Sequence, residues 1–189
     1  MISSKYDWQF ATNFTDEKFL KKAKKAGLEP AAASLLYQRG VQTEEALQEF
    51  LEPSLDQLHD PYDLHDMERA VERIRSAIEN YEQILIYGDY DADGMTSASI
   101  VKEALEQLGA ECQVYLPNRF TDGYGPNSSV YKYFIENQGI SLIITVDNGV
   151  AGLEAIELAQ SLGVDVIVTD HHSMPEELPD AYAIVHPEH

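Results

Sequence analysis

Residues 84–94 decide the fold of this chain; they read Ile84-Leu85-Ile86-Tyr87-Gly88-Asp89-Tyr90-Asp91-Ala92-Asp93-Gly94. An apolar run without polar alternation is typical of a strand that is covered on both faces. Here the run ends in three aspartates. Because ligands collect at the carboxyl ends of strands in open parallel sheets, the stretch predicts a buried strand with a binding site at its end.

The same pattern recurs along the chain and places this first strand in a larger sheet. Further apolar runs that predict strands lie at 114–116, 142–144, 164–168 and, more weakly, 183–185. Helical patterns lie at 95–108, 128–137 and 150–162, and an apolar stripe from Met67 to Tyr81 predicts a long helix before the first strand. Alternating strands and helices predict an α/β fold, a doubly wound, mainly parallel five-stranded sheet.

The N-terminal part follows a different pattern. Helix starts and stops predict short helices from about residue 16 to Gly27, at 31–39 and at 43–50. We therefore expect residues 1–62 to form a small helical appendage and residues 63–189 to form the α/β domain. The lysines of the first helix are interpreted as a solvated face, with contact to phosphate as the alternative.

Composition limits the class of protein. The chain has 189 residues, of which 44% are hydrophobic, as expected for a soluble globular protein. No apolar run approaches the roughly 18 residues needed to span a membrane, and no secretion signal is evident, so a cytoplasmic location is expected. The single cysteine, Cys112, is expected to pack in a strand.

Charge argues against a simple nucleic-acid-binding surface. The formal net charge is -20, whereas phosphate backbones are bound largely through lysine and arginine. Residues 76–189 carry three basic side chains, Lys102, Arg119 and Lys132, against nineteen acidic ones. An anionic polymer therefore requires help from the basic first helix or from a region outside these 189 residues.

Three strand ends carry candidate metal ligands. Asp89, Asp91 and Asp93 follow the first strand, Asp147 follows the strand at 142–144, and Asp170-His171-His172 follows the strand at 164–168. An EF-hand is excluded because Ile100 stands where the loop requires a glutamate. The alternatives are that one aspartate caps the next helix and that Asp147-Asn148-Gly149 is only a turn. Oxygen ligands with one or two imidazoles favour Mn²⁺ or Mg²⁺ and a two-metal site.

These motifs resemble the DHH phosphoesterase superfamily. The resemblance rests on residues 88–94, 146–149 and 170–172, with support from 60–67, 117–120 and 122–125, and covers about residues 50–189. It is strongest with the bacterial exonucleases specific for single-stranded DNA. The resemblance implies a 5′-to-3′ exonuclease that hydrolyses phosphodiester bonds with Mn²⁺ or Mg²⁺ in recombination and repair.

The resemblance also implies roles for particular residues. Asp91, Asp93, Asp147 and His171 match the metal ligands of the superfamily, and Asp89 is a ligand or a neighbour of one. His172 and Arg119 are the expected catalytic residues, since both would contact phosphate, and Arg119 would bind it bidentately. Tyr124 is expected to stack on a base, and Asn118 to join Arg119 and Tyr124 in binding single-stranded DNA.

Two departures suggest that the chain is an N-terminal fragment, nearly inactive alone. It lacks the further metal-binding aspartate and C-terminal domains of the superfamily, and His186-Pro187 replaces the usual Asn-Pro. One alternative is a phosphodiesterase of short oligonucleotides or cyclic dinucleotides, but such enzymes usually carry a histidine where this chain has Tyr87. A metal-free scaffold is disfavoured by the intact motifs, and nothing selects a pyrophosphatase. Protein partners cannot be inferred.

Overall fold

The computed structural model describes residues 16–189, which divide into two compact units at the boundary between His59 and Asp60. Residues 60–62 therefore belong to the larger unit. The first unit contains three helices around a small core of Phe19, Ala23, Ala33 and Leu47. Its elements are α1 (Glu17–Lys25), α2 (Pro30–Gln38), α3 (Glu44–Leu51) and the short helix η1 (Leu55–Gln57).

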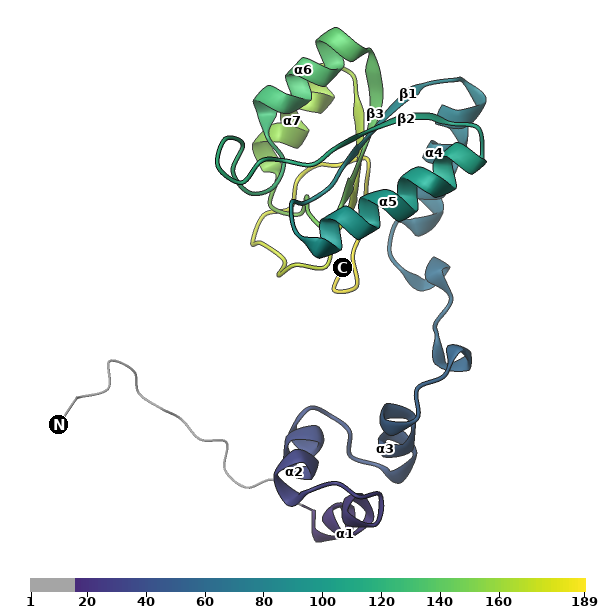
Figure 1. The fold of residues 1–189 in the computed structure, drawn as a ribbon, viewed down its shortest axis with the longest axis vertical. Helices are drawn as coiled ribbons and strands as arrows, with labels where there is room; N and C mark the ends of the chain where they lie inside the picture. Colours follow the sequence, from purple (N-terminus) through teal and green to yellow (C-terminus); the bar gives the residue numbers. More distant parts are fainter. Residues whose placement is uncertain (1–15) are drawn as a thin grey trace, which may run out of the picture. The chain divides into compact units, whose positions relative to one another are not determined.

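The larger unit is a five-stranded sheet with helices on both faces (Figure 1). Its elements in chain order are η2 (Pro61–Asp63), α4 (Met67–Glu79), β1 (Gln83–Tyr87), α5 (Ala92–Gln107), β2 (Glu111–Tyr115), α6 (Ser128–Gln138), β3 (Ile140–Val146), α7 (Leu153–Ser161), β4 (Asp165–Thr169) and β5 (Ala183–Val185). The strand order is β2-β1-β3-β4-β5, and all four strand pairs are parallel. The predicted doubly wound α/β fold is confirmed.

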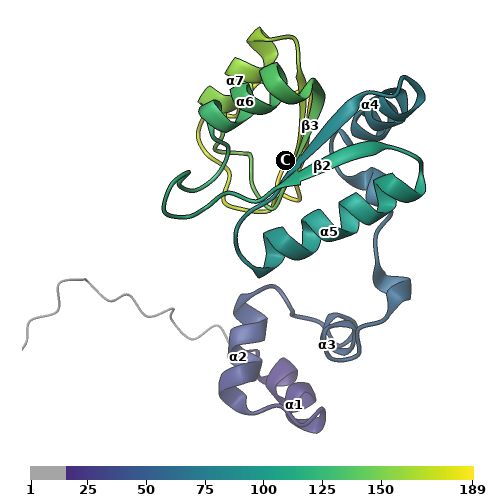
Figure 2. The same cartoon turned by 45° about the horizontal axis from the view of Figure 1, so that its top comes forward.

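Helices cover both faces of the sheet (Figure 2), and each face has its own apolar core. Helices α4 and α5 pack on one face, where Ala70, Ala77 and Ala98 allow close approach to the strands. Helices α6 and α7 cover the other face, where Tyr131 and Ile156 are fully buried. Because β1, β3 and β4 are central strands with helices on both faces, their sequences are continuous apolar runs. Among residues 16–189, no helix is long and apolar enough to cross a membrane.

Several predicted boundaries differ from the observed ones, among them 150–162 for helix α7, and those of α4 and α5 have clear local reasons. Helix α4 ends at Glu79, and Tyr81 lies beyond it with a φ of 56° and 82% of its surface exposed. Helix α5 begins at Ala92, three residues before the expected Met95, because Asp91 caps its amino end.

Arg73 fixes helix α4 to the sheet. Its Nε lies 2.6 Å from Asp165 Oδ2 and its Nη2 lies 2.7 Å from Glu82 Oε2, with only 13% of the Arg73 side chain exposed. Burial alone would lower the pKa of Arg73, but the hydrogen bonds to Glu82 and Asp165 raise it overall. The hydrogen bond from Arg73 in turn lowers the pKa of Glu82.

We expect Arg73→Met to lower the free energy of unfolding by about 2 kcal/mol, since two carboxylates lose their partner in a partly buried setting. Arg75→Met is the control, because Arg75 is exposed on the same helix. The lowered pKa of Glu82 contributes stability at any pH above 4.5, the ordinary pKa of a glutamate. This contribution is lost as the pH falls through the pKa that Glu82 has in the folded protein. Urea unfolding should therefore show that Arg73→Met is less stable than the unaltered chain at pH 7 and that this difference becomes smaller in acid. An equal loss of stability for Arg73→Met and Arg75→Met would contradict this role of Arg73.

Candidate metal centre

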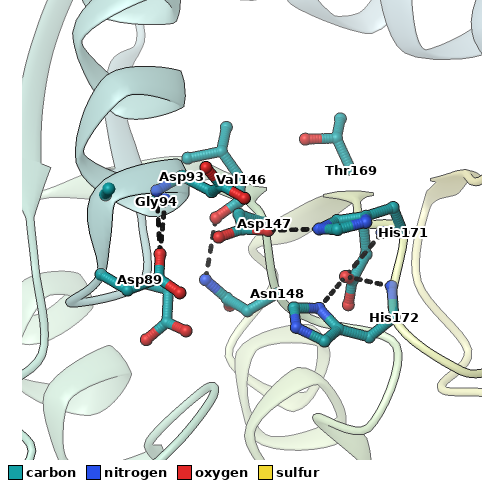
Figure 3. Close-up of polar contacts among 12 residues, drawn as sticks. Asp89, Asp93, Gly94, Val146, Asp147, Asn148, Thr169, His171 and His172 are labelled. Atoms are coloured by element: carbon teal, nitrogen blue, oxygen red, sulfur yellow. Dashed lines mark hydrogen bonds and ion pairs between the residues drawn. The ribbon is translucent and has the colours of Figure 1, made fainter.

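Three loops at the carboxyl ends of neighbouring strands form the candidate site (Figure 3). The loop after β1 carries Asp89, Asp91 and Asp93, the loop after β3 carries Asp147, and the loop after β4 carries residues 170–172. Strands β1, β3 and β4 lie side by side in the sheet. The parallel arrangement therefore brings three motifs that are spread over residues 89–172 to one edge of the sheet.

The first loop is held by its contact with helix α5. Asp91 is the N-cap of α5, and its Oδ1 accepts hydrogen bonds from the N–H groups of Asp93 and Gly94, both at 3.0 Å. The N–H of Gly94 is the main cause that lowers the pKa of Asp91. Gly94 lies directly against Asp89, whose side chain is buried and accepts from the N–H of Tyr90 at 2.6 Å. Helix capping, one alternative for these aspartates, is thus correct for Asp91.

Asp147 lies at the centre of the candidate site. Its backbone is left-handed, with a φ of 62°, and its N–H donates to the carbonyl of Thr169 at 3.0 Å. Its Oδ1 lies 2.8 Å from His171 Nε2, a pair that is visible in Figure 3. Its Oδ2 is buried and, within residues 16–189, has no hydrogen-bond partner. Burial raises the pKa of Asp147, although His171 acts against this rise.

Asp170 holds the backbone of both histidines and the ring of His172 through hydrogen bonds. Its carboxylate accepts from the N–H groups of Val150, His171 and His172 at 2.7–3.1 Å and lies 2.8 Å from His172 Nδ1. Burial would raise the pKa of Asp170, but these donors lower it overall. The contact with Asp170 in turn raises the pKa of His172. With Nδ1 committed to Asp170, Nε2 is the nitrogen of His172 that remains for a ligand.

His186 supports the same loop. It is buried, its Nε2 lies 2.8 Å from the carbonyl oxygen of His172, and its Nδ1 accepts from the N–H of Glu188 at 3.1 Å. Sequence reasoning named Asp170 only as part of the Asp-His-His run and His186 only as a departure from the superfamily, and it gave neither residue a supporting role. Asp170 was visible as the first residue of the Asp-His-His run, whereas no sequence signal linked His186 to His172.

The candidate ligands form two groups that share Asp147. Ligand atoms of Asp89, Asp91 and Asp147 lie within 4.8 Å of one another, and the same holds for Asp147, His171 and His172. Asp93 belongs to neither group and lines a cavity of about 360 Å³ together with Asp147 and His171. The structure thus brings together Asp89, Asp91, Asp147 and His171 of the five predicted ligands, and adds His172.

These donors fit a hard divalent cation. Carboxylate oxygens with imidazole nitrogens suit Mn²⁺ and Mg²⁺, and thiolate is absent from both groups. The buried Oδ2 of Asp147 lacks a partner within the described residues, which is costly for an ionised carboxylate unless a cation is bound. The donor types follow from the sequence motifs, whereas the unpartnered Oδ2 of Asp147 is an observation that only the structure supplies.

The predicted nucleic-acid-binding residues lie on the loop 116–127, between β2 and α6. The guanidinium of Arg119 lies 5.5 Å from the centre of the Tyr90 ring, and the ring of Tyr124 lies 5.8 Å from that of His172. Asn118 shapes the loop, since its Oδ1 accepts from the N–H of Phe120 at 2.9 Å. Arg119 and Tyr124 thus flank the candidate ligands, while Asn118 has a structural contact.

Comparisons with known proteins agree with this geometry. The model of the DHH family, N-terminal domain, matches residues 83–189, and the chain belongs to the DHH family. The chain is 43% identical over 187 residues to the single-stranded-DNA-specific exonuclease RecJ of Bacillus subtilis, covering 99% of this chain and 24% of that protein. It is 40% identical over 164 residues to RecJ of Escherichia coli, covering 86% of this chain and 27% of that protein.

A solved structure shows the same fold. A crystal structure of exonuclease RecJ bound to manganese matches with a TM-score of 0.64 and 30% identity, over 69% of this chain and 33% of that one. The present chain spans about a quarter of the length of the curated relatives named above. The likeness therefore concerns the fold and the centre that this part of the chain carries.

Proposed function

We propose that this domain binds two divalent cations, Mn²⁺ or Mg²⁺, and forms the hydrolytic centre of a 5′-to-3′ exonuclease that acts on single-stranded DNA. The proposed ligands are Asp89, Asp91, Asp93, Asp147 and His171. The observation that carries the proposal is that Asp147 is shared by two clusters of ligand atoms and has a buried Oδ2 without a partner among the described residues.

The chain's own residues supply orientation and charge. Bound cations would lower the pKa of water and offset the negative charge that develops on the phosphate. Asp170 holds His172 through Nδ1, so that Nε2 is directed to the scissile phosphate. Arg119 binds a phosphate oxygen pair, and Tyr124 stacks on a base beside His172.

The substrate class is supported by the relatives, which are named as exonucleases specific for single-stranded DNA. Residues 76–189 have an excess of sixteen negative charges, so binding depends on local contacts such as Arg119, on bound cations and on other parts of the complete gene product. We place the activity in recombination and repair, in the cytoplasm. The alternative substrates are short oligonucleotides and cyclic dinucleotides.

A chain-length series tests this function on the complete gene product. The substrates are single-stranded oligonucleotides of increasing length, the matching duplex and a cyclic dinucleotide, each with Mn²⁺ or with EDTA. We expect mononucleotides to be released from the 5′ end of long single strands with Mn²⁺, and no product with EDTA. Exclusive cleavage of dinucleotides would favour the small-molecule phosphodiesterase, and cleavage in EDTA would contradict a metal centre.

For Arg119→Lys in the complete gene product, we expect a loss of affinity for single-stranded DNA of about tenfold. An ammonium group cannot reproduce the planar fork of a guanidinium on phosphate. Lys132→Ala is the control, because Lys132 is exposed and pairs with Glu136 one helical turn away. Fluorescence anisotropy with Ca²⁺ in place of Mn²⁺ measures binding without cleavage. Unchanged affinity would show that Arg119 does not bind DNA.

A further inference from the structure

The loop 116–127 is held to the sheet at two points by tyrosine hydroxyls. At the first point, Tyr115 at the end of β2 donates to Asp122 Oδ2 at 2.7 Å. The same carboxylate accepts from the N–H of Asn118 at 2.7 Å and from the hydroxyl of Thr121 at 2.9 Å. The Asp122 carboxylate thus closes the segment 118–122, its carbonyl accepts from Asn127 Nδ2 at 3.0 Å on the other arm of the loop, and Tyr115 fixes Asp122 to the sheet.

The second point is deeper. Tyr87, fully buried at the end of β1, donates its hydroxyl to the carbonyl of Gly125 at 3.0 Å. Gly125 directly follows Tyr124, whose ring lies 5.8 Å from His172 and 6.5 Å from Tyr90. The hydroxyl of Tyr87 therefore fixes the backbone beside the residue that faces the candidate metal centre.

The two tyrosines share one aromatic cluster. The ring of Tyr87 lies 5.5 Å from that of Tyr115 and 5.2 Å from that of Tyr131 on helix α6. Phenylalanine would fill the same space, so the hydroxyls are the groups with a specific task. Tyr131 provides a contrast, because its buried hydroxyl has no partner within residues 16–189.

We propose that the hydroxyls of Tyr87 and Tyr115 are positioning groups that hold the loop 116–127 in its DNA-binding form, with Arg119 and Tyr124 beside the carboxylate and histidine cluster. The inference rests on the proposed function. A loop that is already ordered loses less conformational freedom when DNA binds, and this raises affinity without any new contact to DNA. Neither tyrosine hydroxyl touches a candidate metal ligand, so metal binding should be independent of both.

The test uses Tyr87→Phe, Tyr115→Phe and the double variant in the complete gene product, with Tyr131→Phe as the matched control. Each single variant should raise KM for single-stranded DNA about fivefold, the ratio expected for one neutral hydrogen bond. The value of kcat and the affinity for Mn²⁺ should stay unchanged. Tyr131→Phe should leave all three quantities at the unaltered level.

Amide hydrogen exchange gives a second measurement that needs no activity. In Tyr115→Phe, exchange at Asn118 should become faster, whereas in Tyr131→Phe it should not. Unchanged KM, or an equal rise in KM for Tyr131→Phe, would overturn the positioning role. Unchanged exchange would show that the hydroxyl does not hold the loop. If the unaltered protein cleaves no single-stranded DNA, the proposed function itself fails and the DNA-binding role of the loop fails with it.

Discussion

The Asp147→Asn variant should bind Mn²⁺ about a hundredfold more weakly than the unaltered chain, a loss at the upper end of those seen for residues around metal sites. Asp147 is the residue that both ligand groups share, so its loss affects two cations at once. Asparagine tolerates the left-handed φ of 62° at this position and preserves the shape of the side chain. Asp89→Asn should cause a smaller loss, because Asp89 belongs to one group alone.

Calorimetric titration of the 189-residue chain with MnCl₂ measures this ranking. Asp180→Asn is the control, since it removes the same charge from an exposed position outside both groups. Thermal unfolding of each variant without metal separates a lost ligand from a lost fold. Equal affinities for the Asp147 and Asp89 variants would contradict the shared position of Asp147.

Gly94→Ala should destabilise the domain by about 2–3 kcal/mol, the range for an overpacked site. A Cβ at Gly94 would lie 2.5 Å from the carbonyl oxygen of Asp89 and would also overlap its backbone nitrogen. The backbones of Asp89 and Gly94 cannot move apart without displacing the start of helix α5, which contains Gly94. The Asp89 and Asp91 carboxylates would move with it, so Mn²⁺ affinity should fall as well.

The expected loss of stability is opposite in sign to the usual effect of replacing glycine by alanine in a helix. In an open helical position, alanine in place of glycine stabilises a helix by about 1 kcal/mol. Ser99→Ala, exposed on the same helix, should change stability by less than about 0.5 kcal/mol. Urea unfolding of both variants decides the matter. A Gly94→Ala protein that is more stable than the unaltered chain would disprove the close approach of α5 to Asp89.

The fold was predictable because each central strand is a continuous apolar run. Residues 140–146 and 165–169 contain few polar side chains, as burial on both faces requires. Element ends were less predictable. The sequence left open which of the three aspartates caps the next helix; the structure shows that Asp91 caps α5 while its carboxylate also lies in a ligand group.

The site was predictable only where its residues follow strands directly. Asp147 and His171 could be placed because the ends of parallel strands meet at one edge. The support of His172 by His186, and of the 116–127 loop by Tyr87, depends on contacts between segments that are distant in the sequence. Such contacts leave no periodic pattern, so sequence reasoning had no means to find them.

The central claim is that the carboxylate and histidine groups around Asp147 bind divalent cations. The most direct measurement is a crystal structure of the chain grown with MnCl₂, with anomalous diffraction collected to locate manganese. We predict anomalous peaks at about 2.2 Å, a usual metal–ligand distance, from Asp147 Oδ2 and from ligand atoms of Asp89, Asp91 and His171, with His172 outside the coordination sphere. A map with no peak beside Asp147 at saturating MnCl₂ would contradict the account.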